Sequence, residues 1–245
     1  MDLKSEMRAL GLFELFAKVG RPMQISELAE HLGAPVSSCF KLVRAVEQRG
    51  YLYSARARGA LYPTRRLYDI GKAIMENDVL SPRIRDRIAV LRDKVGETVC
   101  LAQRRDKEVV FLEVMESTHS IRFSIGVGDT RPLHANATGK AILSTLPPIE
   151  FQRVLQSLSF ERFSPSTLTT AQALAADIER GRDRGWYSNA GETVPDALAV
   201  AVPVRIGADW YGLAIVGPTY RMEPELSRHL KALVEAARDI DEDRQ

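Results

Sequence analysis

The sequence predicts an α+β protein in which a small helical domain precedes a larger domain built on an antiparallel sheet. Two features support this prediction. Residues 24–50 contain two runs of apolar residues at helical spacing, separated by Gly33 and Pro35. Beyond residue 81, runs rich in β-branched residues follow one another at short intervals and alternate with helical stretches, a spacing that favours antiparallel hairpins.

Residues 24–50 are expected to form two helices joined by a tight turn. Gly33 ends the first helix because glycine adopts the left-handed conformation readily, and Pro35 suits the first turn of the second helix, which runs to about Arg49. The apolar residues of the second helix pack on the first. Its outer face carries hydroxyl, aromatic and cationic side chains and no acid: Ser37, Ser38, Phe40, Lys41 and Arg44.

Residues 51–62, YLYSARARGALY, predict a β-hairpin whose tip carries Arg56 and Arg58. The helix pair alone has a bland alternative, since any small helical hairpin can expose Ser, Lys and Arg. A helix pair followed by a basic hairpin is more specific, because it is the layout of a winged helix-turn-helix domain that reads the major groove of double-stranded DNA. The outer face of the second helix and the two tip arginines are therefore the candidate DNA contacts.

The distribution of charge agrees with this assignment. The whole chain has a formal net charge of +2. Residues 1–66 hold 11 Lys and Arg against 6 Asp and Glu, a net charge of +5, so the rest of the chain stands at −3. A basic first quarter joined to a mildly acidic remainder fits a nucleic-acid-binding module attached to a domain that avoids phosphate.

Cysteine content and apolar patterning restrict the compartment and the chemistry. Only Cys39 and Cys100 occur, one in each expected domain, which excludes a disulfide framework, and the 4 histidines do not cluster at metal-ligand spacing. No apolar stretch reaches the ~18 residues that a membrane-spanning helix needs, and the N-terminus lacks the apolar core of a signal peptide. We therefore expect a cytoplasmic protein with no metal, no cofactor and no membrane partner.

The remaining elements follow from the same patterns. A helix over 5–18 completes the first domain, expected at residues 1–64, and a helix over 66–79, within a linker of 65–80, leads to a second domain of residues 81–245. In the second domain we expect a helix from Pro82 to Gly96, strands over 97–103, 108–114 and 120–128, helices over 137–146, 148–157 and 169–184, strands over 197–206 and 210–217, and a last helix from Pro224 to about Ile240.

The stretch HANATGKA over 134–141 is the most distinctive candidate site of the second domain. It fails as a phosphate-binding loop, because His134 stands where that motif requires Gly and no Ser or Thr follows Lys140. A capped helix with glycine for close packing is one alternative. The other has Asn136 capping a helix whose first amides bind an anion such as a carboxylate: those of Ala137, Thr138 and Gly139.

Nothing in the sequence assembles a catalytic site. Glu192 could serve as a general acid or base, but the sequence fixes no His, Cys or second carboxylate beside it, and no serine lies in a G-x-S-x-G elbow. We therefore predict that the protein is not an enzyme. An α+β enzyme and a DNA-binding scaffold that responds to no ligand remain as the alternatives.

Short fragments run through the chain in a definite order: Pro35 with Ser37, Ser38 and Leu42; Gly96-Glu97-Thr98-Val99; Val127-Gly128; Pro132-Leu133-His134-Ala135; Thr138-Gly139-Lys140-Ala141; Gly185-Trp186 with Glu192; Pro203; and Gly217-Pro218. At these intervals they resemble the IclR family of bacterial transcriptional regulators over nearly the full length. The resemblance implies a GAF-like effector-binding domain behind the winged helix-turn-helix, a homodimer or homotetramer, and ligand-controlled repression or activation of a catabolic operon.

The resemblance also implies an effector pocket for a small carboxylic acid or related metabolite. It adds Leu133 and His134 to the capped-helix residues, and it adds Asn189, whose amide can bind a hydroxyl or carbonyl oxygen or merely cap a loop. A pocket that is less polar and roomier than those of relatives that bind small oxoacids favours an aromatic or branched acid. Such a pocket is expected because relatives that bind small oxoacids tend to have an Asp, a Cys and two Ser where this chain has Asn189, Ala199, Ala214 and Val216.

Overall fold

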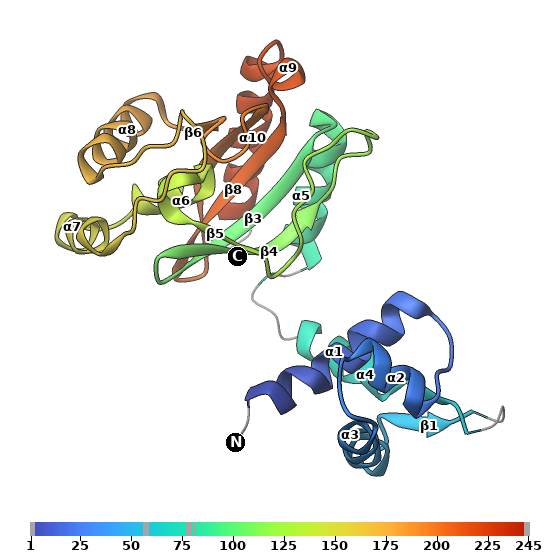
Figure 1. The fold of residues 1–245 in the computed structure, drawn as a ribbon. Coiled ribbons are helices and arrows are strands. Elements are labelled where there is room, and N and C mark those ends of the chain that lie inside the picture. Colours follow the sequence, from blue (N-terminus) through green and yellow to red (C-terminus); the bar gives the residue numbers. More distant parts are fainter. Residues whose placement is uncertain (1–2, 56–58, 77–79, 81, 243–245) are drawn as a thin grey trace. The chain divides into compact units, whose positions relative to one another are not determined.

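The structure is a computed structural model, and it describes residues 3–55, 59–76, 80 and 82–242. The chain packs as two compact units, residues 1–78 and residues 79–245. Figure 1 traces the elements of both units along the chain. The predicted division into residues 1–64, 65–80 and 81–245 stays a prediction.

The first unit combines helices with a two-stranded hairpin: α1 (Leu3–Val19), α2 (Ile25–His31), α3 (Val36–Gln48), β1 (Leu52–Ser54), β2 (Leu61–Pro63) and α4 (Arg66–Glu76). Gly33 turns the chain between α2 and α3 with a φ of 57°, the left-handed conformation expected of a helix stop. One buried cluster joins α1, α2, α3 and the hairpin, with Leu12, Leu28 and Val43 among its members. This arrangement confirms the predicted helix-turn-helix domain.

Two apolar surfaces of the first unit stay accessible. Met7 and Leu10 of α1 are 65% and 61% exposed, so this part of α1 does not pack on the helix pair. α4 buries none of its side chains, and Tyr68, Ile74 and Met75 are exposed. Because clustered apolar side chains in water favour association, α4 remains suited to contact another subunit.

The second unit is built, within the described residues, on a six-stranded antiparallel sheet in the order β5-β4-β3-β8-β7-β6. The strands are β3 (Thr98–Arg105), β4 (Glu108–Met115), β5 (Thr130–Pro132), β6 (Tyr187–Ala190), β7 (Ala197–Ile206) and β8 (Asp209–Pro218). The helices are α5 (Pro82–Val95), α6 (Ala137–Leu143), α7 (Pro148–Ser157), α8 (Ala171–Arg184), α9 (Thr219–Met222) and α10 (Leu226–Glu242), with a 3₁₀ turn over Leu133–Ala135. The sheet and its helices confirm the predicted α+β fold.

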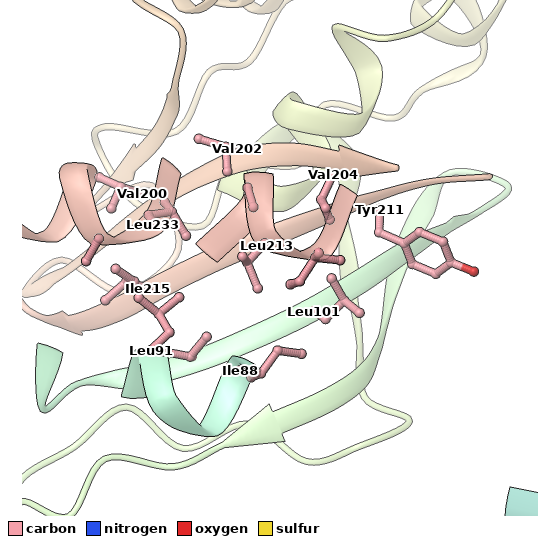
Figure 2. Close-up of a cluster of buried hydrophobic side chains, with 14 of the residues drawn as sticks. Ile88, Leu91, Leu101, Val200, Val202, Val204, Tyr211, Leu213, Ile215 and Leu233 are labelled. Atoms are coloured by element: carbon pink, nitrogen blue, oxygen red, sulfur yellow. The ribbon is translucent and has the colours of Figure 1, made fainter. Parts of the chain in front are cut away.

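One face of the sheet carries large aliphatic side chains. Successive residues of a strand point to opposite faces, and on this face Val202 of β7 and Leu213 of β8 belong to one buried cluster with α5 and α10. Figure 2 shows these side chains together with Leu91 of α5 and Leu233 of α10. Full burial of such a side chain stabilises the fold by about 1.5–3 kcal/mol, so this layer is the main core of the unit.

The opposite face carries small side chains where it meets α6. Cys100, Ala201 and Ala214 point to this side. Gly212 lies under α6, and a Cβ at this position would lie 2.6 Å from the Cβ of Thr138, a distance that real Cβ atoms do not reach. Only glycine therefore lets α6 approach the sheet this closely, and the neighbouring small residues leave space beside the helix.

The predicted strand over residues 120–128 is wrong. The segment is irregular and ends in a turn. β4 pairs with β5 instead, and Phe123 and Ile125 of the segment pack against the buried cluster on the α6 side. Its position is held by other contacts, such as the 2.8 Å hydrogen bond from Thr98 Oγ1 to the carbonyl oxygen of Phe123. β5 and β6 are absent from the prediction because strands of three or four residues are too short to establish an alternating pattern.

Candidate functional site

The predicted DNA-contacting residues of α3 share one exposed surface. Cys39 and Val43 on the other side of the helix are buried in the core. Arg44 donates to Glu47 at 3.2 Å and lies 5.3 Å from the ring of Phe40, so part of its binding capacity is already used. Lys41 has no carboxylate within ion-pair distance among the described residues. The exposed set is Ser37, Ser38, Phe40, Lys41 and Arg44.

The hairpin that follows α3 is present as predicted. β1 and β2 pair antiparallel, with Tyr53 opposite Tyr62. Arg56 and Arg58, the predicted cations of its tip, lie outside the described residues. The hairpin therefore has the strands of a wing, and the role of its two arginines stays a prediction.

Two rows of cross-strand neighbours form the floor of a cavity in the second unit. One row runs from Asn189 through Ala199 to Val216 across β6, β7 and β8. In the next row Ala214 of β8 lies opposite Cys100 of β3. Residues directly opposite each other in antiparallel strands point to the same face, and here that is the face with small side chains.

The walls of the cavity come from segments far apart in the sequence. They are Phe111 of β4, Phe123 and Ile125 of the irregular segment, Arg131 of β5, Asn136, Ala137 and Thr138 at the start of α6, and Thr193 and Ala197 between β6 and the start of β7. The space between these residues is about 480 Å³, counting the part that opens to solvent. The cavity thus brings together most of the predicted effector residues: Asn136, Ala137, Thr138, Asn189, Ala199, Ala214 and Val216.

Three predicted effector residues do not line this cavity. Leu133 is fully buried, and a Cβ on Gly139 would lie 2.5 Å from its carbonyl oxygen, so glycine is needed there for packing. His134 is 1% exposed, with Nε2 2.9 Å from the carbonyl oxygen of Glu161. Its ring packs against an aromatic neighbour, Phe160. These three residues support the start of α6 from behind.

Asn136 caps α6 as predicted, but the hydrogen bonds of the cap occupy amides that the predicted anion site would need. Its Oδ1 accepts from the amide of Thr138 at 2.9 Å and from that of Gly139 at 3.4 Å. Two of the three amides expected to bind a carboxylate are therefore already occupied by the protein itself. Because Oδ1 accepts these bonds, Nδ2 of Asn136 is a donor, and it has no acceptor among the described residues.

Asn189 borders the cavity, yet its amide is also committed to the protein. Nδ2 donates to the carbonyl oxygen of Ala135 at 2.7 Å and to Thr193 Oγ1 at 3.3 Å, and Oδ1 accepts from the amide of Glu192 at 2.8 Å. This side chain fixes the loop that follows β6 against the start of α6. The loop-capping alternative therefore describes the bonds of Asn189 better than a free ligand-binding amide does.

Arg131 lines the cavity and carries a formal charge, but it is not among the effector residues predicted from the sequence. It is one of the residues that line the wall, and its Nη1 donates to the carbonyl oxygen of Thr130 at 2.8 Å. The other unpredicted wall residues are apolar or weakly polar, and strand alternation around 108–114 could have indicated Phe111. No local motif marks Arg131, apart from its place directly before Pro132.

A buried cluster of charges lies behind the cavity. Lys140 of α6 is 1% exposed. Its Nζ pairs with Glu192, lies 2.8 Å from Asp177 of α8, and donates to the carbonyl oxygen of Ser188 at 2.9 Å. One ammonium group therefore ties α6 to α8, to β6 and to the loop after β6, which satisfies the requirement that a buried charge be paired.

The two carboxylates of this cluster respond differently to burial. Loss of hydration raises the pKa of Glu192, because it outweighs the attraction of Lys140. Burial also opposes ionisation of Asp177, but Lys140 and Arg180 together outweigh it and hold the pKa of this carboxyl below its ordinary value. The cluster therefore serves to stabilise the fold.

Cys100 is the one thiol in the cavity wall, and burial raises its pKa to about 12. It is therefore a neutral thiol near pH 7 and not a thiolate nucleophile. Across the described ranges, His, Cys, Asp and Glu side chains form no group that could hold a metal ion. In the same residues no helix has the length and apolar character to span a membrane.

Comparison with known proteins gives the family. The model of the bacterial transcriptional regulator IclR C-terminal domain matches residues 73–242, and the IclR helix-turn-helix domain matches residues 7–56. The chain belongs to the IclR family. It is accordingly a transcriptional regulator with a DNA-binding helix-turn-helix domain, and not an enzyme.

Individual members of the IclR family align over almost the whole chain. The HTH-type transcriptional regulator BhcR of Paracoccus denitrificans is 30% identical over 236 residues, which cover 95% of this chain and 84% of BhcR. The crystal structure of the Thermotoga maritima IclR has a TM-score of 0.80 at 23% identity and covers 99% of each chain. An IclR homologue from Microbacterium hydrocarbonoxydans, solved in complex with 4-hydroxybenzoate, has a TM-score of 0.71 at 24% identity and covers 98% of each chain.

Replacement of Lys140 tests the role of the buried cluster in this IclR-family domain. Lys140→Met is expected to destabilise the second unit by about 3–5 kcal/mol, because Glu192 and Asp177 lose their shared cation. The additional change Glu192→Gln should recover part of the loss by removing one uncompensated charge. Urea unfolding followed by circular dichroism measures both effects.

The pH dependence of stability tests the direction of the pKa shift of Glu192. The folded protein holds the proton of Glu192 more tightly than the unfolded chain does, because burial raises the pKa. The stability of the wild type relative to Glu192→Gln should therefore fall as the pH rises above the ordinary pKa of 4.5. A wild-type midpoint for Lys140→Met, or a stability difference that grows with pH, would contradict the account.

Proposed function

We propose that this protein is a ligand-responsive regulator of a catabolic operon, and that its effector is a small carboxylic acid or a related metabolite bound in the cavity of the second unit. The cavity is the single observation that carries this proposal. It is bordered by Cys100, Asn136 and Asn189, which lie far apart in the sequence but meet around one space. A scaffold that had lost its ligand would have no need to keep such a space between α6 and the sheet.

DNA recognition is assigned to α3 and the hairpin. A single recognition helix contacts too few base edges for useful specificity, so we propose a homodimer or homotetramer that reads two half-sites of double-stranded operator DNA. The accessible apolar side chains of α4, such as Ile74, supply a surface for contact between subunits. α4 also joins the two units in sequence, which makes it the natural element to carry a signal from the cavity to DNA.

The proposed ligand class has support from a relative. The homologue from Microbacterium hydrocarbonoxydans binds 4-hydroxybenzoate, a small aromatic carboxylic acid. The cavity of this chain has two aromatic side chains, Phe111 and Phe123, and several small apolar ones, which suits a compact ligand with an apolar body.

The DNA-reading role of α3 is tested with Lys41→Ala. An operator is first selected from random duplexes with the full-length protein, and affinities are then measured for that operator and for random DNA. Loss of a contact to a base edge should cost roughly 1–3 kcal/mol on the operator and less on random DNA. Lys231→Ala removes the same charge from the exposed side of α10 in the second unit and serves as the control. Equal losses of affinity on both DNAs would show that Lys41 contacts the DNA backbone and not a base edge.

The effector role of the cavity is tested by filling it. Ala199→Leu adds bulk to the half-buried floor, so a ligand that stabilises the wild type by binding its native state should lose most of that effect. Thermal shift against a panel of carboxylic acids measures the loss, while effector-free operator affinity should stay within about twofold. Ala236→Leu on α10 is the control. An unchanged ligand response in Ala199→Leu would place the effector elsewhere.

A further inference from the structure

Arg131 stands on the face of the sheet that forms the cavity. It lies opposite Val109 in the pairing of β5 with β4, and directly opposite residues point to the same side. Val109 and Phe111 both belong to the buried cluster on the α6 side. The register therefore explains why Arg131 lines the cavity and does not lie on the opposite face.

The positive charge of Arg131 has no anionic partner among the described residues. Nη1 donates to the carbonyl oxygen of Thr130, which is neutral, and no carboxylate of the described residues lies within 4.0 Å of the guanidinium. The cavity wall contains no Asp or Glu. A half-buried guanidinium with free donors and no anion gains most from a ligand that brings a negative charge, since charge-assisted hydrogen bonds are about twice as strong as neutral ones.

Asn136 lines the same space and carries a second donor. Nδ2 of Asn136 has no acceptor among the described residues, whereas its Oδ1 is held by the amides of Thr138 and Gly139. Arginine presents a planar fork that matches the two oxygens of a carboxylate. The cavity thus offers a cation and an amide donor for one anionic group.

The rest of the wall has no site for a second charge. Phe111, Phe123, Ile125 and Val216 are apolar, and the amide of Asn189 is bonded within the protein. Aromatic side chains favour contact with another ring in offset or edge-to-face geometry. A dicarboxylate or a short polar oxoacid would leave either a charge unpaired or the apolar wall unfilled.

From these observations, and resting on the proposed effector function of the cavity, we propose that Arg131 is the specificity-determining residue that binds the effector's carboxylate. The preferred ligand class is an aromatic monocarboxylate whose ring lies against Phe111 and Phe123. The capped end of α6 contributes the Nδ2 donor of Asn136, not the helix amides.

Ligand titration with the full-length protein tests this assignment. The probes are benzoate, phenylacetate and 3-phenylpropionate, each paired with its neutral amide, together with pyruvate and succinate. We expect at least one aromatic acid to bind, and to bind more tightly than its amide, pyruvate and succinate. Arg131→Met should weaken that acid about 10- to 100-fold, as expected for loss of a hydrogen bond to a charged group, while the affinity for the amide changes less than about threefold.

Two controls keep the result interpretable. Arg153→Met removes the same charge from the exposed surface of α7 and should bind every probe as the wild type does. Arg131→Gln replaces Arg131→Met if the latter does not fold, as judged from its ligand-free melting temperature. Wild-type affinity of the acid for the Arg131 variant would overturn the proposal, and so would the absence of binding by any aromatic acid.

The outcome also separates this inference from the function on which it rests. If the acid binds Arg131→Met as tightly as wild type but fails to bind Ala199→Leu, the cavity remains the effector site and the role of Arg131 is refuted. If the acid binds Ala199→Leu normally, the cavity itself is refuted as the site.

Discussion

The close approach of α6 to the sheet is the constraint on which the site depends. A Cβ at Gly212 would lie 2.6 Å from Thr138, and one at Gly139 would lie 2.5 Å from the carbonyl oxygen of Leu133, so two glycines hold the helix start between the sheet and the preceding turn. The same small-side-chain face leaves the cavity beside the helix. Lys140 then fixes the far side of α6 through its buried ion pairs. Packing and charge therefore fix the positions of the residues that line the cavity.

Most of the fold could be predicted from the sequence, because most elements are long enough to show a period. The helix ends at Gly33 and Gly96 follow from the left-handed conformation that both adopt. The segment 120–128 misled the prediction because alternating apolar residues also arise where a loop packs two side chains inward, here Phe123 and Ile125. β5, at Thr130–Pro132, is too short to be seen.

The candidate site was predictable only in part. The capped start of α6 and the small residues of β7 and β8 could be identified from motif and resemblance. The hydrogen bonds that already occupy these polar groups could not be predicted. Asn136 occupies the amides expected to bind an anion, and Asn189 is bonded to its own loop. Arg131 escaped notice because its importance arises from register with β4 and from the absence of an acid around it, neither of which is a local property of the sequence.

We propose that ligand binding in the cavity and operator binding by α3 are coupled. Thermodynamic linkage requires the coupling to be reciprocal, so the direct measurement is the Kd of one stabilising acid with and without saturating operator DNA, together with the Kd of the operator with and without the acid. We expect the affinities for the acid and for the operator to change by the same factor, in the range of about 5- to 150-fold that such couplings show. Identical acid affinities in the presence and absence of operator would contradict it.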